Sequence, residues 1–279
     1  MIKQLILVVG PTASGKTDLA IQLALKNNCP IISADSRQIF KELNIGVAKP
    51  SEEQLQTVEH YFINYKSIFE DYNVADYVTD ARHLINQLFE VNETLVICGG
   101  TGMYIQSLIN GIDILPEKDI VLREKIQGQI NIQGIEKVIE EYKYCISSEL
   151  IQSRNPQRII RAIEISESKT SMKADVPEFI WKIEIDIQYI ELKRTELYDR
   201  INKRVDYMIQ DGLENEAKSF YKNRALNALK TVGYSEWWDY FEGKVKKEFV
   251  IEKIKQHSRN YAKRQITWFN NQLPKLKII

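Results

Sequence analysis

Short apolar runs alternate with amphipathic stretches along the N-terminal part of the chain. Leu5–Val9 is a β-branched apolar run that ends at a glycine, and Pro30–Ala34 and Thr94–Cys98 repeat this pattern. Apolar runs of this length are typical of parallel strands that are buried on both faces. An amphipathic helical pattern begins at about Lys16, and another covers Val74–Phe89. Because strands and helices alternate, the chain is predicted to contain a doubly wound α/β core.

A different pattern follows Ile114. Residues 115–153 are charged and helix-prone, with a polar turn at Gly128–Gly134, and they predict a small all-helical insert. Residues 1–114 and 154–279 are then predicted to form the α/β core together with a helical C-terminal region.

The chain downstream of the insert is mostly helical. Asn155 and Pro156 are typical of a helix start, and Ile183–Ile190 alternates apolar and polar residues as a strand does. The C-terminal helical pattern ends in the basic segment KIKQHSRNYAKRQITWF. Its cations suit an RNA backbone, whereas aromatics in a charged helix can also pack inward. We expect both, with Trp268 and Phe269 packed and the basic side facing RNA.

Composition and charge exclude several classes of protein. Lys and Arg equal Asp and Glu in number, so the chain has no overall cationic field and any nucleic-acid site must be a local patch. The three cysteines are scattered and show no zinc-binding or disulfide spacing. No stretch reaches the roughly 18 apolar residues of a membrane span, and the N-terminal apolar run is too short for a signal peptide. We therefore expect a cytoplasmic protein with no membrane partner.

The first apolar run leads into GPTASGKT, a phosphate-binding loop of the form G-x-x-x-x-G-K-T. Its glycines let backbone N–H groups turn inward, its lysine adds a positive charge, and the hydroxyl of Thr17 is placed to hold Mg²⁺. The alternative is a plain glycine turn followed by a lysine at a helix start. The predicted diphosphate-binding residues are Gly10, Pro11, Thr12, Ala13, Ser14, Gly15, Lys16 and Thr17.

The third strand lacks an aspartate at its end. Most enzymes that use a nucleoside triphosphate have a strand-end aspartate that helps to hold magnesium. Here the strand reads LVICGGT instead. A phosphate-binding loop without that carboxylate suits a diphosphate that leaves better than a γ-phosphate that is transferred.

Two polar residues follow strand ends, where side chains of this fold face the ligand crevice. Asp35 comes directly after the second strand, where it can accept a proton, bind a metal or simply cap a helix. Thr101 follows the paired glycines of the third strand and can form a hydrogen bond there or serve as a turn residue. Position alone does not separate these alternatives.

A helix near residue 160 carries two arginines on one face. Arg158 and Arg161 are three residues apart and can hold phosphates, while Ile159, Ile160 and Ile163 can face a core. The alternative is a solvated face that is paired with the glutamate at position 164.

Several motifs together identify a family. The chain contains, in order, GPTASGKT, ISADSRQIF, IGVAKP, GGTGMYIQSLINGI, NPQRIIRAIEI, VGYSE and YAKRQITWF. This series spans almost the whole chain and resembles the tRNA isopentenyltransferase family, the tRNA dimethylallyltransferases. The resemblance implies a P-loop NTPase-like parallel sheet core. It also implies that dimethylallyl diphosphate, bound with Mg²⁺, donates its five-carbon group to N6 of the adenine immediately 3′ of a tRNA anticodon, and that diphosphate leaves.

The resemblance also implies roles for individual residues. Asp35 matches the family's group that removes the proton from N6, a role that suits a weakly nucleophilic amine. Thr101 matches a threonine that forms hydrogen bonds near the reacting centre. The insert would clamp the anticodon loop of a tRNA that is bound by a monomer, and the adenine would have to be extruded from its stack. The implied tRNA contacts are Asp35, Ser36, Arg37, Gln38, Thr101, Arg123, Gln157, Arg158, Ile159, Ile160 and Arg161.

Three other functions fit part of the pattern. An adenylate isopentenyltransferase would prenylate free AMP or ATP, but it needs neither the insert nor the basic helix. A P-loop kinase for a small molecule would use Arg154, Arg158 and Arg161 as lid arginines, but the GGTG-x-Y motif and the missing aspartate count against it. A non-catalytic RNA-binding protein is disfavoured because Lys16 and Asp35 are intact.

Overall fold

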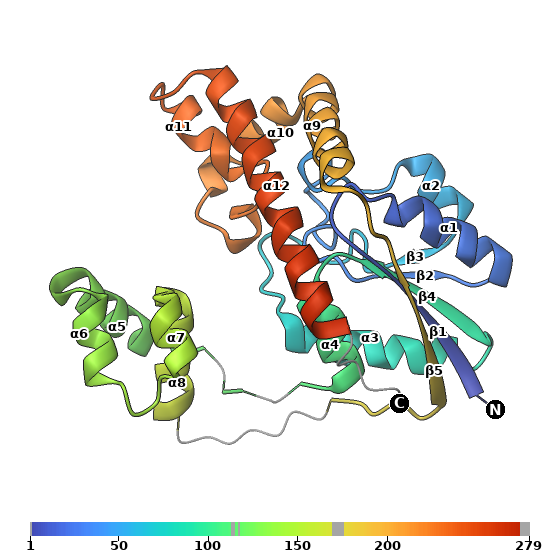
Figure 1. The fold of residues 1–279 in the computed structure, drawn as a ribbon, viewed down its shortest axis with the longest axis horizontal. Helices are drawn as coiled ribbons and strands as arrows, with labels where there is room; N and C mark the ends of the chain where they lie inside the picture. Colours follow the sequence, from blue (N-terminus) through green and yellow to red (C-terminus); the bar gives the residue numbers. More distant parts are fainter. Residues whose placement is uncertain (1, 113–114, 117, 169–175, 274–279) are drawn as a thin grey trace. The chain divides into compact units, whose positions relative to one another are not determined.

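Five parallel strands form the centre of the larger of two units in the computed structural model (Figure 1). The structure describes residues 2–112, 115–116, 118–168 and 176–273. The predicted parallel sheet is confirmed, although the shortest strand has too few residues to leave an apolar pattern in the sequence. In order of pairing, the strands are β3 (His60–Tyr61), β2 (Ile31–Ser33), β4 (Thr94–Gly99), β1 (Ile2–Val9) and β5 (Lys182–Tyr189).

Alternate side chains of each strand pack on opposite faces of the sheet. Leu5 and Leu7 of β1 belong to the main apolar core, which includes helices α3 and α4. Ile6 and Val8 pack in a second cluster with α1. Both faces are covered, as buried parallel strands require. The helices of this unit are α1 (Lys16–Asn27), α2 (Glu52–Thr57), α3 (Val74–Leu88), α4 (Gly102–Asn110), α9 (Arg194–Gln210), α10 (Leu213–Ser219), α11 (Trp238–Phe241) and α12 (Lys247–Gln272).

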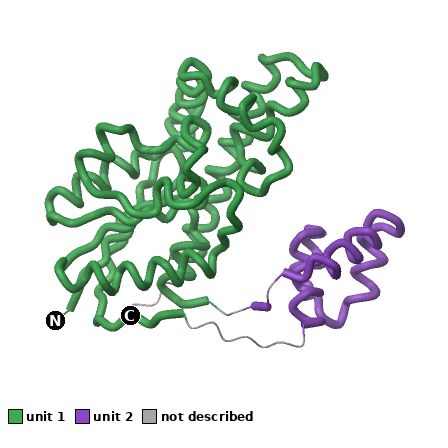
Figure 2. The backbone as a smooth tube through the Cα atoms, turned by 180° about the vertical axis from the view of Figure 1, so that it is seen from behind, with its two compact units in different colours: residues 1–112, 176–279 green, residues 113–175 purple. Residues whose placement is uncertain are grey.

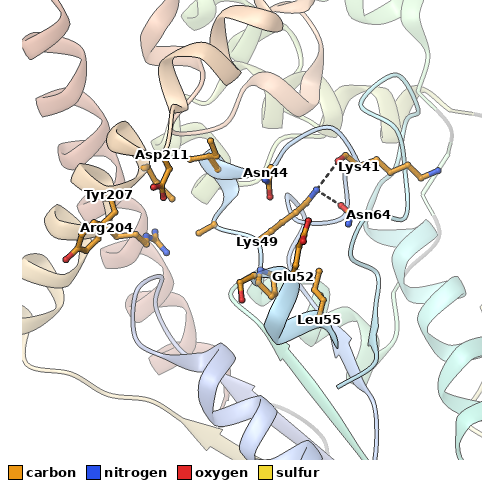
Figure 3. A pocket seen from close by; sticks show the side chains of 14 residues that line it. Lys41, Asn44, Lys49, Glu52, Leu55, Asn64, Arg204, Tyr207 and Asp211 are labelled. Atoms are coloured by element: carbon orange, nitrogen blue, oxygen red, sulfur yellow. Dashed lines mark hydrogen bonds between the residues drawn. The ribbon is translucent and has the colours of Figure 1, made fainter. Parts of the chain in front are cut away.

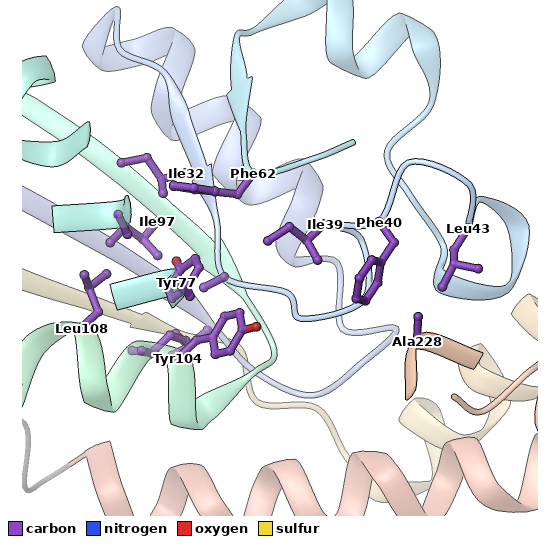
Figure 4. Close-up of a cluster of buried hydrophobic side chains, with 14 of the residues drawn as sticks. Ile32, Ile39, Phe40, Leu43, Phe62, Tyr77, Ile97, Tyr104, Leu108 and Ala228 are labelled. Atoms are coloured by element: carbon purple, nitrogen blue, oxygen red, sulfur yellow. The ribbon is translucent and has the colours of Figure 1, made fainter. Parts of the chain in front are cut away.

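Two stacked tyrosines connect the core to the carboxyl end of β2. The rings of Tyr77 and Tyr104 lie 4.1 Å apart and almost parallel, and the Tyr77 hydroxyl donates to the carbonyl of Ser33 at 3.2 Å. Figure 4 shows both rings in the same cluster of buried side chains as Ile39 and Phe40, which follow β2 in the chain. The stacked rings therefore hold the last residue of β2 in place through its carbonyl.

The C-terminal helices pack as the sequence predicts. Trp237 and Phe269 are fully buried, and the ring of Trp268 lies against Gly102, where an added Cβ would come within 2.2 Å of it. Part of the basic side of α12 has partners within the unit, because Lys255 pairs with Asp206 and Arg259 donates to Asn202. None of the described helices is long and apolar enough to cross a membrane.

The smaller unit covers residues 113–175 (Figure 2). Helices are the regular elements of its described residues, 115–116 and 118–168. The unit extends to residue 175, whereas the predicted insert ends at 153, so the helix after residue 155 belongs to it. The reason is that Ile159 and Ile163 pack with Ile126. Residues 113 and 114, where the other predicted boundary falls, lie outside the described residues. Its helices are α5 (Ile120–Gln133), α6 (Ile135–Glu141), α7 (Ser148–Ser153) and α8 (Pro156–Glu167).

The predicted turn in this unit is bounded by two glycines, Gly128 and Gly134, and only Gly134 lies in a turn. Gly128 lies inside α5, and an added Cβ there would meet nothing within 4 Å. Gly134 joins α5 to α6 with a φ of +86°, a conformation that favours glycine. The turn is therefore confined to Gly134.

A buried carboxylate organises the smaller unit. Glu164 of α8 accepts two hydrogen bonds from Arg123, each 2.7 Å long, and one from the backbone N–H of Asp119 at 2.6 Å. It also pairs with Arg161, which donates to the carbonyl of Pro116. Burial alone would raise the pKa of Glu164, but these hydrogen bonds outweigh it and hold the pKa at about 2.

We expect Glu164→Gln to destabilise the smaller unit by about 3 kcal/mol at neutral pH, because it leaves two arginines without their shared carboxylate. The pKa of Glu164 is lower in the folded state, so its contribution is complete above about pH 4.5 and is lost as the pH falls towards 2. The stability difference between wild type and variant should vanish over that range. Urea titrations followed by the methyl NMR signals of Ile126 and Ile163 measure it.

Glu167→Gln is the matched control for this prediction. Glu167 lies on the same helix but is exposed and accepts a hydrogen bond from Tyr144. Exposed pairs contribute less than about 1 kcal/mol, so this variant should unfold almost as wild type does. Equal stability losses in the two variants would contradict the organising role of Glu164.

Candidate active site

The predicted phosphate-binding loop joins β1 to α1. Gly10 and Gly15 have φ values of +150° and +94°. At Gly10 an added Cβ would lie 3.0 Å from the carbonyl oxygen of Ile190. The Lys16 ammonium folds back and donates to the carbonyl of Pro11 at 2.6 Å. The loop thus places a cation at the N-terminus of α1, where the helix dipole also favours an anion.

Buried polar atoms around this loop have no protein partner. Ser14 Oγ and Arg204 Nε are buried and form no hydrogen bond within the described part of the chain. Burial lowers the pKa of Lys16 to about 8, although Cys98 and Asp35 act in the opposite direction. Buried donors normally have acceptors. Ser14 Oγ and Arg204 Nε therefore fit the oxygens of a bound diphosphate, and the Lys16 ammonium, which donates to the Pro11 carbonyl, adds its positive charge beside them.

Arg204 is a site residue that the sequence analysis missed. It lies on α9 among the buried residues Ile201, Val205 and Met208, and its guanidinium donates to the Thr12 hydroxyl at 2.6 Å. Burial lowers the pKa of Arg204, and Asp35 opposes this shift. The sequence does carry a sign of this role, because Arg204 lies next to apolar positions that recur at helical spacing along α9.

Gln265 of α12 is a second residue that the sequence analysis missed. Its Oε1 accepts a hydrogen bond from the backbone N–H of Thr12 at 2.7 Å, and its Nε2 donates to the carbonyl of Gly100 at 2.9 Å. The side chain therefore connects the phosphate loop to the end of β4. No local pattern marks it, because this contact joins segments from opposite ends of the chain.

The ends of β2 and β4 bring Asp35 and Thr101 together. The N–H of Ser36 donates to the Thr101 hydroxyl at 3.0 Å. Asp35 Oδ1 accepts hydrogen bonds from the N–H groups of Arg37 and Gln38, at 2.8 and 3.3 Å, so this oxygen holds a turn, and no helix starts here for Asp35 to cap. The other oxygen, Oδ2, has no hydrogen bond among residues 2–112 and 176–273 and remains available for chemistry.

Two cavities meet at Asp35. The phosphate-loop cavity has a volume of about 280 Å³ and is lined by the loop, Arg204 and Lys49. A basic cavity of about 300 Å³ is lined by Lys230, Tyr261 and Arg264. Their shared lining residues are Thr12, Asp35 and Val47.

A third, larger cavity adjoins the phosphate loop. It has a volume of about 560 Å³, and its lining includes Tyr207, Asp211 and Asn44 (Figure 3). Lys49 and Arg204 line both this outer cavity and the phosphate-loop cavity. Burial lowers the pKa of Lys49 to about 8. A charged substrate that approaches the loop from this side therefore meets two cations.

The residues after Asp35 differ in where their side chains point. Ser36 and Arg37 line the basic cavity, and the Arg37 guanidinium donates to the carbonyl of Asn227 at 3.2 Å. Gln38 instead lines the phosphate-loop cavity, and its amide nitrogen donates to the carbonyls of Val47 and Ala48. Ser36 and Arg37 thus remain candidates for contact with a substrate, whereas the Gln38 amide has a structural role.

The candidate tRNA contacts of the smaller unit also differ, because some side chains are buried or paired within the unit and others are exposed. The side chains of Ile159 and Ile160 are buried in the core of the smaller unit, so contact between these residues and RNA stays a prediction that involves their backbone. The interaction of Arg161 with Glu164 predicted as the alternative is present, but the carboxylate is buried rather than solvated. Arg123 shares that carboxylate. Gln157 and Arg158 are exposed, as an RNA contact requires.

Thr17, the expected metal ligand, is part of the lining of the phosphate-loop cavity. Asp18 and Asp35 line the same cavity. No group of three or more His, Cys, Asp or Glu side chains arranged for a metal occurs among the described residues. A hydroxyl beside a bound diphosphate is a donor set that suits Mg²⁺, which keeps waters and binds substrate phosphates.

We expect the affinity for inorganic diphosphate to fall about tenfold for each pH unit above about 8, because the neutral Lys16 amine no longer attracts the diphosphate. Isothermal titration calorimetry between pH 7 and 9.5 measures this trend. In Lys16→Met the dissociation constant should be higher and should depend less steeply on pH, because Lys49, whose pKa is also about 8, still lines the cavity. A trend that survives in Lys16→Met but disappears in Lys49→Met would assign it to Lys49 instead.

Comparisons with known proteins agree with this geometry. The protein-family model described as IPP transferase matches residues 38–272. A tRNA dimethylallyltransferase of Flavobacterium johnsoniae is 42% identical over 279 residues, covering 96% of this chain and 90% of that protein. One of Cytophaga hutchinsonii is 41% identical over 278 residues, with 96% and 90% covered. The crystal structure of a Bacillus halodurans tRNA isopentenylpyrophosphate transferase superposes with a TM-score of 0.70 at 32% identity, covering 98% of this chain and 88% of that one. The chain therefore belongs to the IPP transferase family.

Proposed function

We propose that this protein transfers a dimethylallyl group from dimethylallyl diphosphate to N6 of the adenine that lies 3′ of the anticodon in tRNA. The observation that carries this proposal is the junction of two cavities at one free carboxylate oxygen of Asp35. One cavity has the donors for a diphosphate, and the other has aromatic and cationic groups for a nucleotide. The relatives named tRNA dimethylallyltransferase support the same chemistry.

The diphosphate of the donor would lie in the phosphate-loop cavity. Lys16, Ser14 and Arg204 supply buried donors for its oxygens. Mg²⁺, held by the Thr17 hydroxyl and the diphosphate, supplies charge neutralisation when bound. The positive groups of the loop stabilise the leaving diphosphate as its charge develops.

The acceptor adenine would enter the basic cavity with its N6 facing Asp35. The N6 nitrogen forms a bond to C1 of the dimethylallyl group, and the bond between C1 and the diphosphate oxygen breaks. The proton from N6 passes to Asp35 Oδ2, which completes the transfer. Oδ1 remains bonded to the N–H groups of Arg37 and Gln38 and keeps the carboxylate oriented throughout.

Exposed groups outside this junction would bind the rest of the tRNA. Gln157 and Arg158 of the smaller unit and Arg264 of the basic cavity are available for phosphates. We propose that a monomer binds one anticodon stem-loop and that the reaction takes place in the cytoplasm, where tRNA is found.

The first test supplies radiolabelled dimethylallyl diphosphate and Mg²⁺ to the protein with either an unmodified anticodon stem-loop or free AMP. Label should enter the stem-loop and not AMP. Label in AMP alone would make the protein an adenylate isopentenyltransferase. Failure of both acceptors, with ATP turnover on a small metabolite, would favour a kinase.

We expect Asp35→Asn to lower the transfer rate by about two to four orders of magnitude, because it removes the proton acceptor. The amide oxygen can still accept the N–H groups of Arg37 and Gln38, so the turn should persist. Single-turnover transfer to the stem-loop, with the donor dissociation constant measured separately, checks this. Asp239→Asn, which removes an exposed partner of Lys244, is the control. A rate loss explained entirely by weaker donor binding would contradict the role of Asp35 as base.

A further inference from the structure

One loop forms the wall between the two cavities that meet at Asp35. This dividing loop, residues 44–50, includes the 3-10 helix η1 (Ile45–Val47). Gly46 and Val47 line the basic cavity, while Val47, Ala48 and Lys49 line the phosphate-loop cavity. Because Val47 lines both, the position of the dividing loop sets the opening through which the two substrates would meet.

A single carboxylate holds the N-terminal end of the dividing loop. Glu216 of α10 accepts hydrogen bonds from the N–H groups of Asn44, Ile45 and Gly46, at 3.0, 2.7 and 3.4 Å. Three consecutive backbone donors that converge on one carboxylate fix both the position and the direction of the segment. Glu216 lines neither of the two cavities that meet at Asp35, so it would act only through the loop.

Tyr234 supports the same end of the loop. Its hydroxyl donates to Glu216, and its ring lies so close to Gly46 that an added Cβ would come within 2.5 Å of it. Tyr234 is fully buried, so the ring cannot move away without opening the core. The Glu216 carboxylate and the Tyr234 ring together hold the N-terminal end of the dividing loop in a single position.

Two further side chains hold the C-terminal end of the loop. The Gln38 amide donates to the carbonyls of Val47 and Ala48, and Ala48 has a φ of +49°. The Lys49 ammonium donates to Asn64 and to the carbonyl of Lys41 (Figure 3). Side chains rather than a regular element thus fix the loop at both ends, so its position depends on each of them.

We propose that Glu216 is a positioning residue that sets the dividing loop and so couples loss of diphosphate to prenylation of the acceptor. This inference rests on the proposed function. When the loop is held in place, Val47 leaves room beside C1 of the donor for the acceptor amine but not for water. When the loop is released, water enters, its oxygen bonds to C1, the bond to diphosphate breaks, and a proton is lost to solvent. Dimethylallyl alcohol and diphosphate then form without any transfer.

The test compares diphosphate released with prenyl groups transferred to the stem-loop in wild type and Glu216→Gln. Wild type should release one diphosphate for each transfer. In the variant an amide replaces the carboxylate and places N–H donors against backbone donors. We expect the ratio to rise several-fold and the transfer rate to fall roughly tenfold to a hundredfold, as misplaced reacting groups do. The donor dissociation constant should change little.

Glu214→Gln is the matched control, because Glu214 lies on the same helix and pairs only with Lys247 among the described residues. It should keep the wild-type ratio. Tyr234→Phe removes one hydrogen bond to Glu216 and keeps the ring, so it should raise the ratio of diphosphate released to prenyl groups transferred by a smaller factor. If Glu216→Gln does not fold, this ratio in Tyr234→Phe tests the proposal instead. A lower melting temperature with an unchanged ratio would reduce Glu216 to a structural residue and overturn the proposal. Absence of transfer by wild type would instead refute the proposed function.

Discussion

The close approach of β2 and β4 at Gly99 is the constraint on which the candidate site depends. A Cβ at Gly99 would lie 2.3 Å from the carbonyl oxygen of Ala34, so only glycine allows these strand ends to meet. Backbone hydrogen bonds then join Ala34 to Cys98 and to Thr101, at 2.8 and 3.2 Å. Asp35 follows Ala34 directly. The separation of the candidate base from the threonine is thus set by backbone pairing rather than by flexible side chains.

Residues from the far end of the chain complete the phosphate loop. Thr12 illustrates this, because its N–H donates to Gln265 and its hydroxyl accepts from Arg204. A loop with two of its polar groups held by α12 and α9 is ordered before any ligand binds, which reduces the entropy lost on binding. The α/β core alone would leave these groups without partners.

The sequence predicts most of the fold because buried parallel strands and amphipathic helices leave strong local patterns. Asp35 and Thr101 could also be predicted, since each follows a strand at the edge where ligands bind. Arg204, Gln265 and Glu216 could not, because their partners are distant in the sequence. The helix after residue 155 shows a further limit of prediction from sequence. Its apolar face can be recognised in the sequence, but the sequence does not say whether that face packs in the core of the larger or of the smaller unit.

The buried carboxylate of Glu164 determines how easily two arginines of the smaller unit can bind RNA phosphates. Arg123 and Arg161 share a buried carboxylate, so moving either guanidinium to a phosphate would leave Glu164 short of donors in a poorly solvated place. These arginines therefore order the unit, and any contact that they make with RNA has to keep their hydrogen bonds to Glu164. Arg158, on the same helix but exposed, has no such cost. Two arginines three residues apart thus have different surroundings, and the difference comes from one glutamate within the same motif.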